Sequence, residues 1–177
     1  MSTVVKEKNI TQDVVALINK SLSLNPSIRA IRQEACDAFE KMALPENKSE
    51  EYRHTPITRQ LQKNFDFETP NATSGEFHLE DYFIPSVDGN VVVLINGVFS
   101  PAHSSISSPN EVQISNLSEA LAQQDNPALQ YIGNYADYKS DPFIAWNTAS
   151  WKHGVFVHVP ANTVVTKPII IYNIHDT

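Results

Sequence analysis

Apolar residues recur at helical spacing through the first third of the chain. Thr11 can cap a first helix, with Asp13 in the first turn, where a carboxylate suits the helix dipole. A second helix is predicted after Asn25 as N-cap, with Pro26 as its first residue. Its apolar stripe consists of Ile28, Ile31, Ala35, Ala38, Phe39 and Met42, and Leu44-Pro45 ends it. We expect the two helices to pack together as a helical hairpin.

A polar connection follows this hairpin. Residues 45–63 contain the segment EYRHTP and a short helical pattern at Ile57 and Leu61. Residues 64–76 are rich in Asn, Thr, Ser, Pro and Gly, which is typical of a loop. The sequence therefore predicts an N-terminal helical region over residues 1–63.

A strand pattern begins after the loop. The β-branched run 91–95 is followed by Asn96-Gly97 and then by Val98-Phe99, which Pro101 stops early. Strand, Asn-Gly, strand predicts a β-hairpin. Three more elements are predicted downstream: a short strand at 112–114, a helix over 117–124 capped by Ser118 or Asn116, and a helix over 142–151 with Phe143, Trp146, Ala149 and Ser150 on one face. Residues 64–141 are thus expected to form a mixed α/β connecting region.

The final stretch, 142–177, is the richest in strand patterns. Segments 155–159 and 164–174 are short apolar strands separated by Pro and small polar residues. Because a two-stranded unit is only marginally stable, the last strand either completes an earlier sheet or belongs to a longer protein. Short strands repeating at about ten residues favour the first rungs of a parallel β-helix. The predicted fold class is α+β, a helical region followed by the first strands of a right-handed parallel β-helix (a β-solenoid) that is truncated.

Length and charge limit the function classes. The chain has 177 residues, enough for one ordinary domain or for a small domain and part of a second. Its net charge is −7, and Lys and Arg form no evident cluster, so nucleic acid and anionic membranes are not expected partners. The sequence shows neither a membrane-spanning apolar run nor the apolar core of a secretory signal. We therefore expect a cytoplasmic protein.

Few residues offer chemistry of their own. Cys36 is the single cysteine, and its place beside Ala35 and Phe39 on the second predicted helix favours a small core residue over a cluster ligand. No GxSxG elbow and no phosphate-binding GxxxxGK[ST] motif is present. No catalytic residue is predicted, and the chain is not expected to be an enzyme.

The histidines support an alternative hypothesis. Gly154 followed by Val-Phe-Val-His matches half of a cupin metal motif, but Pro160 stands where that motif needs a second His. If 155–159 is a strand, His158 points to the same side as Phe156, and a ligating role is disfavoured. The alternative is a small β-helical or cupin-like metal-binding protein that would use His153, His158 or His175.

Three segments carry a family resemblance. Segment 50–57 contributes Glu51, Tyr52, Arg53 and Thr55; segment 92–106 contributes Asn96, Gly97 and Phe99; and segment 147–174 contributes Gly154, Pro160 and Pro168. In this order, over residues 28–177, they resemble the SufB/SufD family, the scaffold subunits of the Suf iron–sulfur cluster assembly machine. The first two segments are more similar to its SufD branch, although Tyr52 replaces the usual Trp and His54 the usual aromatic residue.

The resemblance implies a function. Family members are much longer, so the chain resembles the N-terminal portion of one. It implies a non-enzymatic scaffold that pairs with a SufB-like scaffold and a SufC-like ATPase, with homodimerisation as a further possibility. Partner subunits would handle the cluster and the ATP, and this segment would bind no cofactor and no metal. The motif residues named above are expected to have structural or interaction roles.

Overall fold

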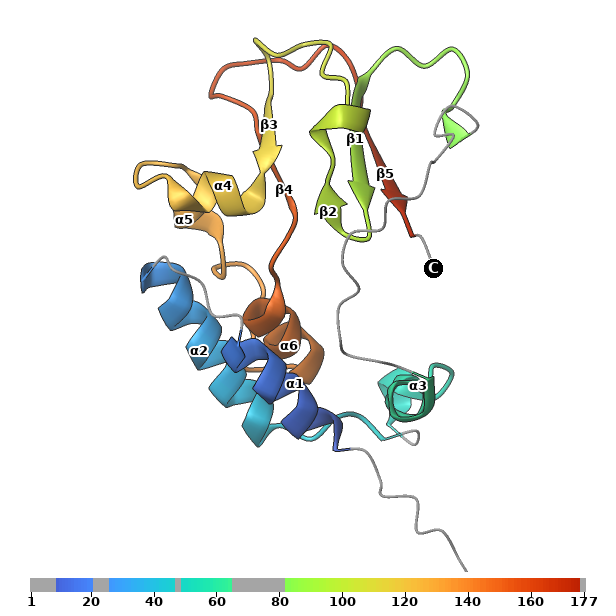
Figure 1. The fold of residues 1–177 in the computed structure, drawn as a ribbon, viewed down its shortest axis with the longest axis vertical. Coiled ribbons are helices and arrows are strands. Elements are labelled where there is room, and N and C mark those ends of the chain that lie inside the picture. Colours follow the sequence, from blue (N-terminus) through green and yellow to red (C-terminus); the bar gives the residue numbers. More distant parts are fainter. Residues whose placement is uncertain (1–8, 21–25, 47–48, 65–81, 176–177) are drawn as a thin grey trace, which may run out of the picture. The chain divides into compact units, whose positions relative to one another are not determined.

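The computed structural model describes residues 9–20, 26–46, 49–64 and 82–175 (Figure 1). The chain divides into two compact units. The helical unit comprises residues 1–69 and 130–151, and the strand unit comprises 70–129 and 152–177. Each unit is discontinuous in sequence, because the chain leaves the helical unit, builds most of the strand unit, returns, and leaves again.

The helical unit is built on α2 (Pro26–Lys41), which packs against α1 (Ile10–Lys20) and α6 (Pro142–Ser150), as Figure 1 shows. α3 (Ile57–Asn64) contributes Leu61 to the same core. The buried core residues are Ile10, Val14, Ile18, Ala35, Cys36, Phe39, Leu61, Ala145 and Ala149. The predicted pairing of the first two helices is confirmed, and Cys36 is a core residue as expected.

Local chemistry sets the helix starts. α1 begins at Ile10, and the Asn9 side chain accepts a hydrogen bond from the Gln12 backbone N–H at 3.3 Å. Asn9 therefore caps the helix, and the prediction of Thr11 as cap is wrong by two positions. Pro26 begins α2 as predicted, whereas the predicted cap Asn25 lies outside the described residues. Asp141, which the sequence analysis overlooked, caps α6 by accepting from the N–H groups of Phe143 and Ile144.

The packing of α6 differs from the expectation that residues 142–151 open the strand region. α6 packs against α2, and its residues Ala145 and Ala149 are fully buried. The expected face of Phe143, Trp146, Ala149 and Ser150 is only partly right, because Thr148 is buried too. Two small alanines allow close approach of the helix backbones, a property that apolar periodicity does not reveal. The division of the chain at 63/64 and 141/142 into domains stays a prediction.

Two small sheets form the strand unit. The first has the order β2-β1-β5, with β1 (Asn90–Ile95) antiparallel to β2 (Val98–Phe99) and parallel to β5 (Ile169–Ile174). The second pairs β3 (Gln113–Asn116) antiparallel with β4 (Val155–His158). Two short helices follow β3: α4 (Leu117–Ala122), which is capped by Asn116, one of the two predicted candidates, and α5 (Ala128–Tyr131), which was not predicted. The observed β3 starts one residue later and ends two residues later than the predicted strand 112–114.

The predicted hairpin is confirmed. Asn96 and Gly97 join β1 to β2 with Ile95 opposite Val98, and their φ values are 49° and 81°. Positive φ at both central residues defines a type I′ turn, which Asn-Gly adopts with little strain and which matches the twist of the flanking strands. A 3₁₀ turn at Pro101–His103 follows, so β2 is short, as Pro101 predicted.

The fold class is α+β, as expected. The last strand completes an earlier sheet, because β5 pairs with β1 rather than with β4. The right-handed parallel β-helix stays a prediction, and the one parallel pair in the described sheets is β1–β5. None of the described helices has both the length and the apolar composition needed to cross a membrane.

Candidate functional site

The candidate site is the outer edge of β5. This strand pairs with β1 on one side, from Asn90 opposite Ile169 to Ile95 opposite Ile174. The backbone N–H of Asn90 donates to the carbonyl of Pro168 at 2.8 Å, and that of Asn96 donates to the carbonyl of Ile174 at 2.8 Å. Alternate residues of a strand direct their N–H and C=O groups to opposite sides. The backbone N–H and C=O groups of the even-numbered residues of β5 therefore point toward β1. Those of Ile169, Ile171 and Asn173 point away from β1, to the outer edge of the sheet.

The outward groups have no backbone partner within the described part of the chain, because β5 is the edge strand of its sheet. The sequence IIIYNI contains no charge, Pro or Gly. Natural edge strands are usually protected by a charged residue, a proline, a bulge or a covering segment. The outward N–H and C=O groups of this edge can therefore pair with the backbone of another strand.

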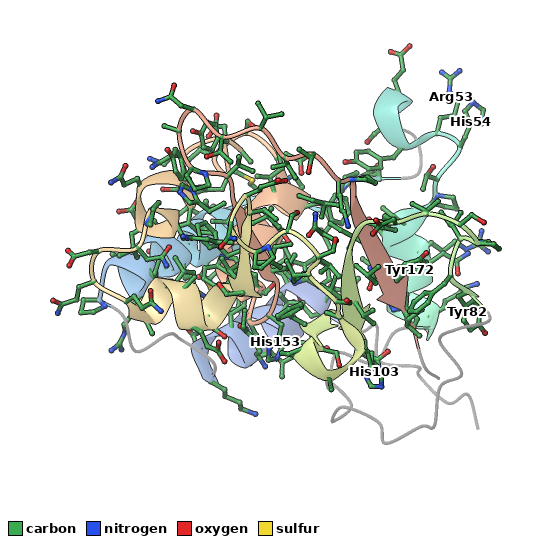
Figure 2. The ribbon with its side chains drawn as sticks, turned by 90° about the horizontal axis from the view of Figure 1, so that it is seen from above. Arg53, His54, Tyr82, His103, His153 and Tyr172 are labelled. Atoms are coloured by element: carbon green, nitrogen blue, oxygen red, sulfur yellow. The ribbon has the colours of Figure 1, made fainter. Side chains whose placement is uncertain are left out.

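Apolar side chains flank the edge on both faces of β5. On one face the Ile171 side chain is 53% exposed. On the other face the Tyr172 ring lies 5.0 Å from the Phe83 ring, and its hydroxyl accepts a hydrogen bond from the Ile84 N–H at 3.0 Å. The neighbouring segment leaves Tyr82, Ile84 and Val87 exposed; Figure 2 labels Tyr82 and Tyr172. Apolar residues on both sides of an open edge are suited to the side chains of an added strand.

A polar joint fixes the beginning of the β1–β5 pair. Asn90 is fully buried, and its side-chain oxygen accepts from both the N–H and the hydroxyl of Ser108 at 3.0 Å. Its side-chain nitrogen donates to the carbonyl of Lys167 at 3.3 Å. One amide thus connects β1, the loop before β3 and the residue before Pro168. Asn90 was not among the residues predicted from the sequence to matter.

Two more polar contacts hold the start of β5. Lys167 Nζ lies 2.7 Å from a carboxylate oxygen of Asp88. The Glu111 carboxylate accepts hydrogen bonds from the backbone N–H of Thr166 at 2.8 Å and from its hydroxyl at 2.9 Å. The backbone bond, the hydroxyl bond and the nearby Lys167 charge stabilise the ionised form and lower the pKa of Glu111. These contacts position the strand whose outer edge is open.

Gly89 allows the close approach of the two strands. A Cβ at this position would lie 2.9 Å from the carbonyl oxygen of Pro168 and 3.1 Å from the Ile170 side chain. A substitution there would push β5 away from β1. The family-motif residue Pro168 lies at this joint. Its ring is exposed, and its carbonyl accepts the hydrogen bond from the Asn90 backbone N–H.

The other motif residues of the strand unit have identifiable places. Asn96 and Gly97 form the hairpin turn, and Phe99 is buried. The carbonyl of Gly154 accepts from the Leu117 N–H at 3.0 Å, immediately before β4, and Pro160 follows this strand. These residues shape turns and strand ends. Their expected interaction roles stay predictions.

The motif around residue 52 lies in the helical unit. The Tyr52 ring contacts the Phe143 ring at the start of α6, with 5.7 Å between centroids. Glu51 belongs to the 3₁₀ turn Glu50–Tyr52, with its side chain outside the described part. Arg53 and Thr55 follow and are exposed. Tyr52 thus anchors the motif through its contact with Phe143. Figure 2 labels the neighbouring exposed residues Arg53 and His54.

Arg32 is a buried charge that sequence reasoning missed. Its guanidinium Nε donates to the carbonyl of Ala149 at 2.7 Å, and its Cζ lies 5.8 Å from the Trp151 ring centroid. Burial lowers the pKa of Arg32. The cation caps the C-terminal end of α6, where the helix dipole favours positive charge. Its role is structural, since it joins α2 to α6.

Cys36 and the histidines show no convergent chemistry. Burial, together with Asp37 and Glu40, raises the pKa of the Cys36 thiol, which disfavours a reactive thiolate. His158 stacks on Phe156 with ring centroids 5.9 Å apart, which confirms that both point to one side of the strand. No group of three His, Cys, Asp or Glu residues suited to a metal occurs among the described residues. His153 and His175 are exposed, and the metal-binding alternative gains no support from the described part.

A comparison with protein families decides the relationship. The model described as "SufBD protein N-terminal region" matches residues 9–171. The chain belongs to the SufBD family. The family resemblance found in the sequence is thereby confirmed for the N-terminal portion.

One SufBD relative is described by function. It is a protein of Synechocystis sp. (strain ATCC 27184 / PCC 6803 / Kazusa) named as an iron–sulfur cluster assembly SufBD family protein. The chain is 28% identical to it over 140 residues, which is 78% of this chain and 30% of that protein. The chain therefore spans less than a third of the length of this SufBD relative.

Proposed function

We propose that this chain is a non-enzymatic scaffold component of the Suf iron–sulfur cluster assembly complex, on the SufD branch of the family. It associates with a SufB-like scaffold and a SufC-like ATPase in the cytoplasm. The nascent cluster is cargo of the complex, and partner subunits supply the ATP chemistry. In the absence of the SufB-like partner, the chain pairs with a second copy of itself.

The observation that carries this proposal is the family match over residues 9–171. The name of the Synechocystis relative, which refers to iron–sulfur cluster assembly, supports the biological role. The SufD branch is supported by the hairpin around Asn96-Gly97 and by the segment EEYRHTPI, which resemble that branch in sequence.

The open edge of β5 supports assembly through strands. The pair β1–β5 is parallel and in register over six residues, as successive rungs of a β-helix are. A further strand added to Ile169, Ile171 and Asn173 would continue a right-handed β-helix and bury the exposed Ile171 side chain. Main-chain hydrogen bonds would supply affinity, and the apolar side chains on both faces would supply specificity.

Co-expression with the SufB-like and SufC-like proteins of the same organism tests the proposal. We expect the chain to co-purify with both and to contain no stoichiometric metal when purified alone. A folded chain that binds neither partner, or one that carries stoichiometric metal by itself, would contradict the scaffold role.

A matched pair of variants tests the edge separately from the scaffold role. Ile171→Lys places a charge on the open edge, whereas Val164→Lys places the same charge on a side chain that is 78% exposed. We expect Ile171→Lys to weaken strand-mediated association by about tenfold or more, and Val164→Lys to leave it within about twofold. Equal behaviour of the two variants would remove the edge from the interface without affecting the family assignment.

A further inference from the structure

The second surface of interest is a group of basic residues in the helical unit, outside the β5 edge. Between Tyr52 and Asn64 the chain has Arg53, Arg59 and Lys63 and no Asp or Glu. All three side chains are exposed. We call these three residues the basic stripe. This local group is not apparent from the net charge of the whole chain, which is −7.

The docking of α3 explains why these residues face solvent. Ile57 and Leu61, four residues apart on one helix face, pack into the core, and Leu61 is 8% exposed. The hydroxyl of Thr58 donates to the carbonyl of Pro45 at 2.7 Å, which fixes the start of the helix. Arg59 and Lys63 are also four residues apart, so they share another face, one helical turn from each other. Arg53 precedes the helix, in the loop anchored by Tyr52.

Among the residues that the structure describes, no carboxylate forms an ion pair with the basic stripe. Within the described part of the chain, the ion pair that forms is Lys167–Asp88, and Arg53, Arg59 and Lys63 form none. Glu50 and Glu51 lie before Arg53 in the sequence, but the stripe itself contains only cations. In a chain with a net charge of −7, three unpaired exposed cations within eleven positions, 53–63, are a local reversal of the overall charge.

We propose that the basic stripe is a docking surface for an acidic helical segment of a protein partner. Carboxylates one helical turn apart on such a segment match the spacing of Arg59 and Lys63, and Arg53 can bind a third carboxylate bidentately. A nucleic acid is disfavoured, because three cations on an acidic chain provide few phosphate contacts. The inference does not depend on the scaffold role, since it rests on α3 and its flanking loop alone.

Binding of a labelled peptide to the whole chain tests the proposal. The probe is an Ala-rich helical peptide of about 18 residues with glutamates at i and i+4. We expect measurable binding at low salt that weakens toward about 0.15 M salt, as exposed ion pairs do. Arg59→Glu with Lys63→Glu should weaken binding about tenfold or more. Arg29→Glu with Lys152→Glu changes the net charge equally at two other exposed positions and should stay within about twofold.

Three outcomes would overturn the proposal. Equal loss in both double variants would mean that net charge alone controls binding. Equal binding of an isomeric peptide with its glutamates at i and i+2 would remove the match to a helix face. Tighter binding of a single-stranded oligonucleotide than of the peptide would assign the stripe to nucleic acid. Circular dichroism of the variants, together with the neutral pair Arg59→Gln and Lys63→Gln, separates lost binding from lost structure.

Discussion

The helical unit and the strand unit are each stabilised internally in a different way. The helical unit has one core in which Phe39, Ala145 and Ala149 are completely buried. The strand unit has two small sheets, fastened by the Asn90 amide, the Glu111–Thr166 contact and the Lys167–Asp88 ion pair. Apolar side chains such as Val92, Val93 and Val112 are buried in the strand unit too, and there polar joints add to the packing by positioning the strands.

The exposed large apolar side chains follow the same division. Among the described residues of the strand unit they are Tyr82, Ile84, Val87, Val157, Val159, Val164 and Ile171, whereas those of the helical unit are Tyr131 and Tyr135. Of these, Ile171 is in the edge strand β5 and the Ile84 N–H bonds to Tyr172 of the same strand, and exposed apolar groups at an open strand edge are suited to association. The contrast teaches that the helical unit buries its own apolar surface, while the strand unit offers part of its apolar surface to partners.

The largest expected effect tests the packed core. Phe39 is fully buried, and its ring lies 5.6 Å from the Trp146 ring. Phe39→Ala should lower the free energy of unfolding by about 3–5 kcal/mol, because it removes burial and leaves a cavity. Phe156→Ala in the half-buried strand β4 should cost about 1–2 kcal/mol. Urea denaturation of both variants measures the difference, and a larger loss for Phe156→Ala would reverse the comparison.

A smaller effect is expected at the polar joint. Asn90→Leu keeps the number and branching of the side-chain heavy atoms but leaves the Ser108 N–H and the Lys167 carbonyl without their partner. We expect a loss of about 2–4 kcal/mol in the free energy of unfolding. Asn110→Leu, at a nearby exposed position, is the control and should change stability by less than about 0.5 kcal/mol. Similar stability of the two variants would show that the joint does not hold the sheet.

The smallest effect concerns acid. The hydrogen bonds from Thr166 lower the pKa of Glu111 from its ordinary value of 4.5. Its contribution to stability is therefore complete above 4.5, and it is lost as the pH falls through the lower pKa of the folded state. Melting temperatures of the wild type and of Glu111→Gln should differ by a constant amount at neutral pH and converge in acid. A gap that widens as the pH falls would contradict the assignment.

Local features were predictable from the sequence, because neighbouring residues determine them. The Asn96-Gly97 turn follows from the need for positive φ, the start of α2 from Pro26, and the alternation of Phe156 and His158 from strand geometry. A local competition between two polar residues was misjudged, since Asn9 caps α1 in place of Thr11.

Contacts between distant segments could not be predicted in the same way. The parallel pairing of β1 with β5 and the bond from Arg32 to Ala149 have no local pattern. Asn90 and Glu111 appear in the sequence as ordinary polar residues, and only the segments that approach them make them structural. The open edge of β5 could not be predicted either, because it is defined by the pairing of β1 with the other side of this strand.

The separation of contacting segments along the chain has a consequence for synthesis. Arg32 meets a carbonyl 117 residues later, and β1 pairs with the last described strand. During translation, the first two helices therefore leave the ribosome long before α6 can cover them, and β1 leaves long before β5. The growing chain leaves Phe39 without α6 and the β1 edge without β5 throughout this interval, so both surfaces are exposed to aggregation until the C-terminal segments have been made.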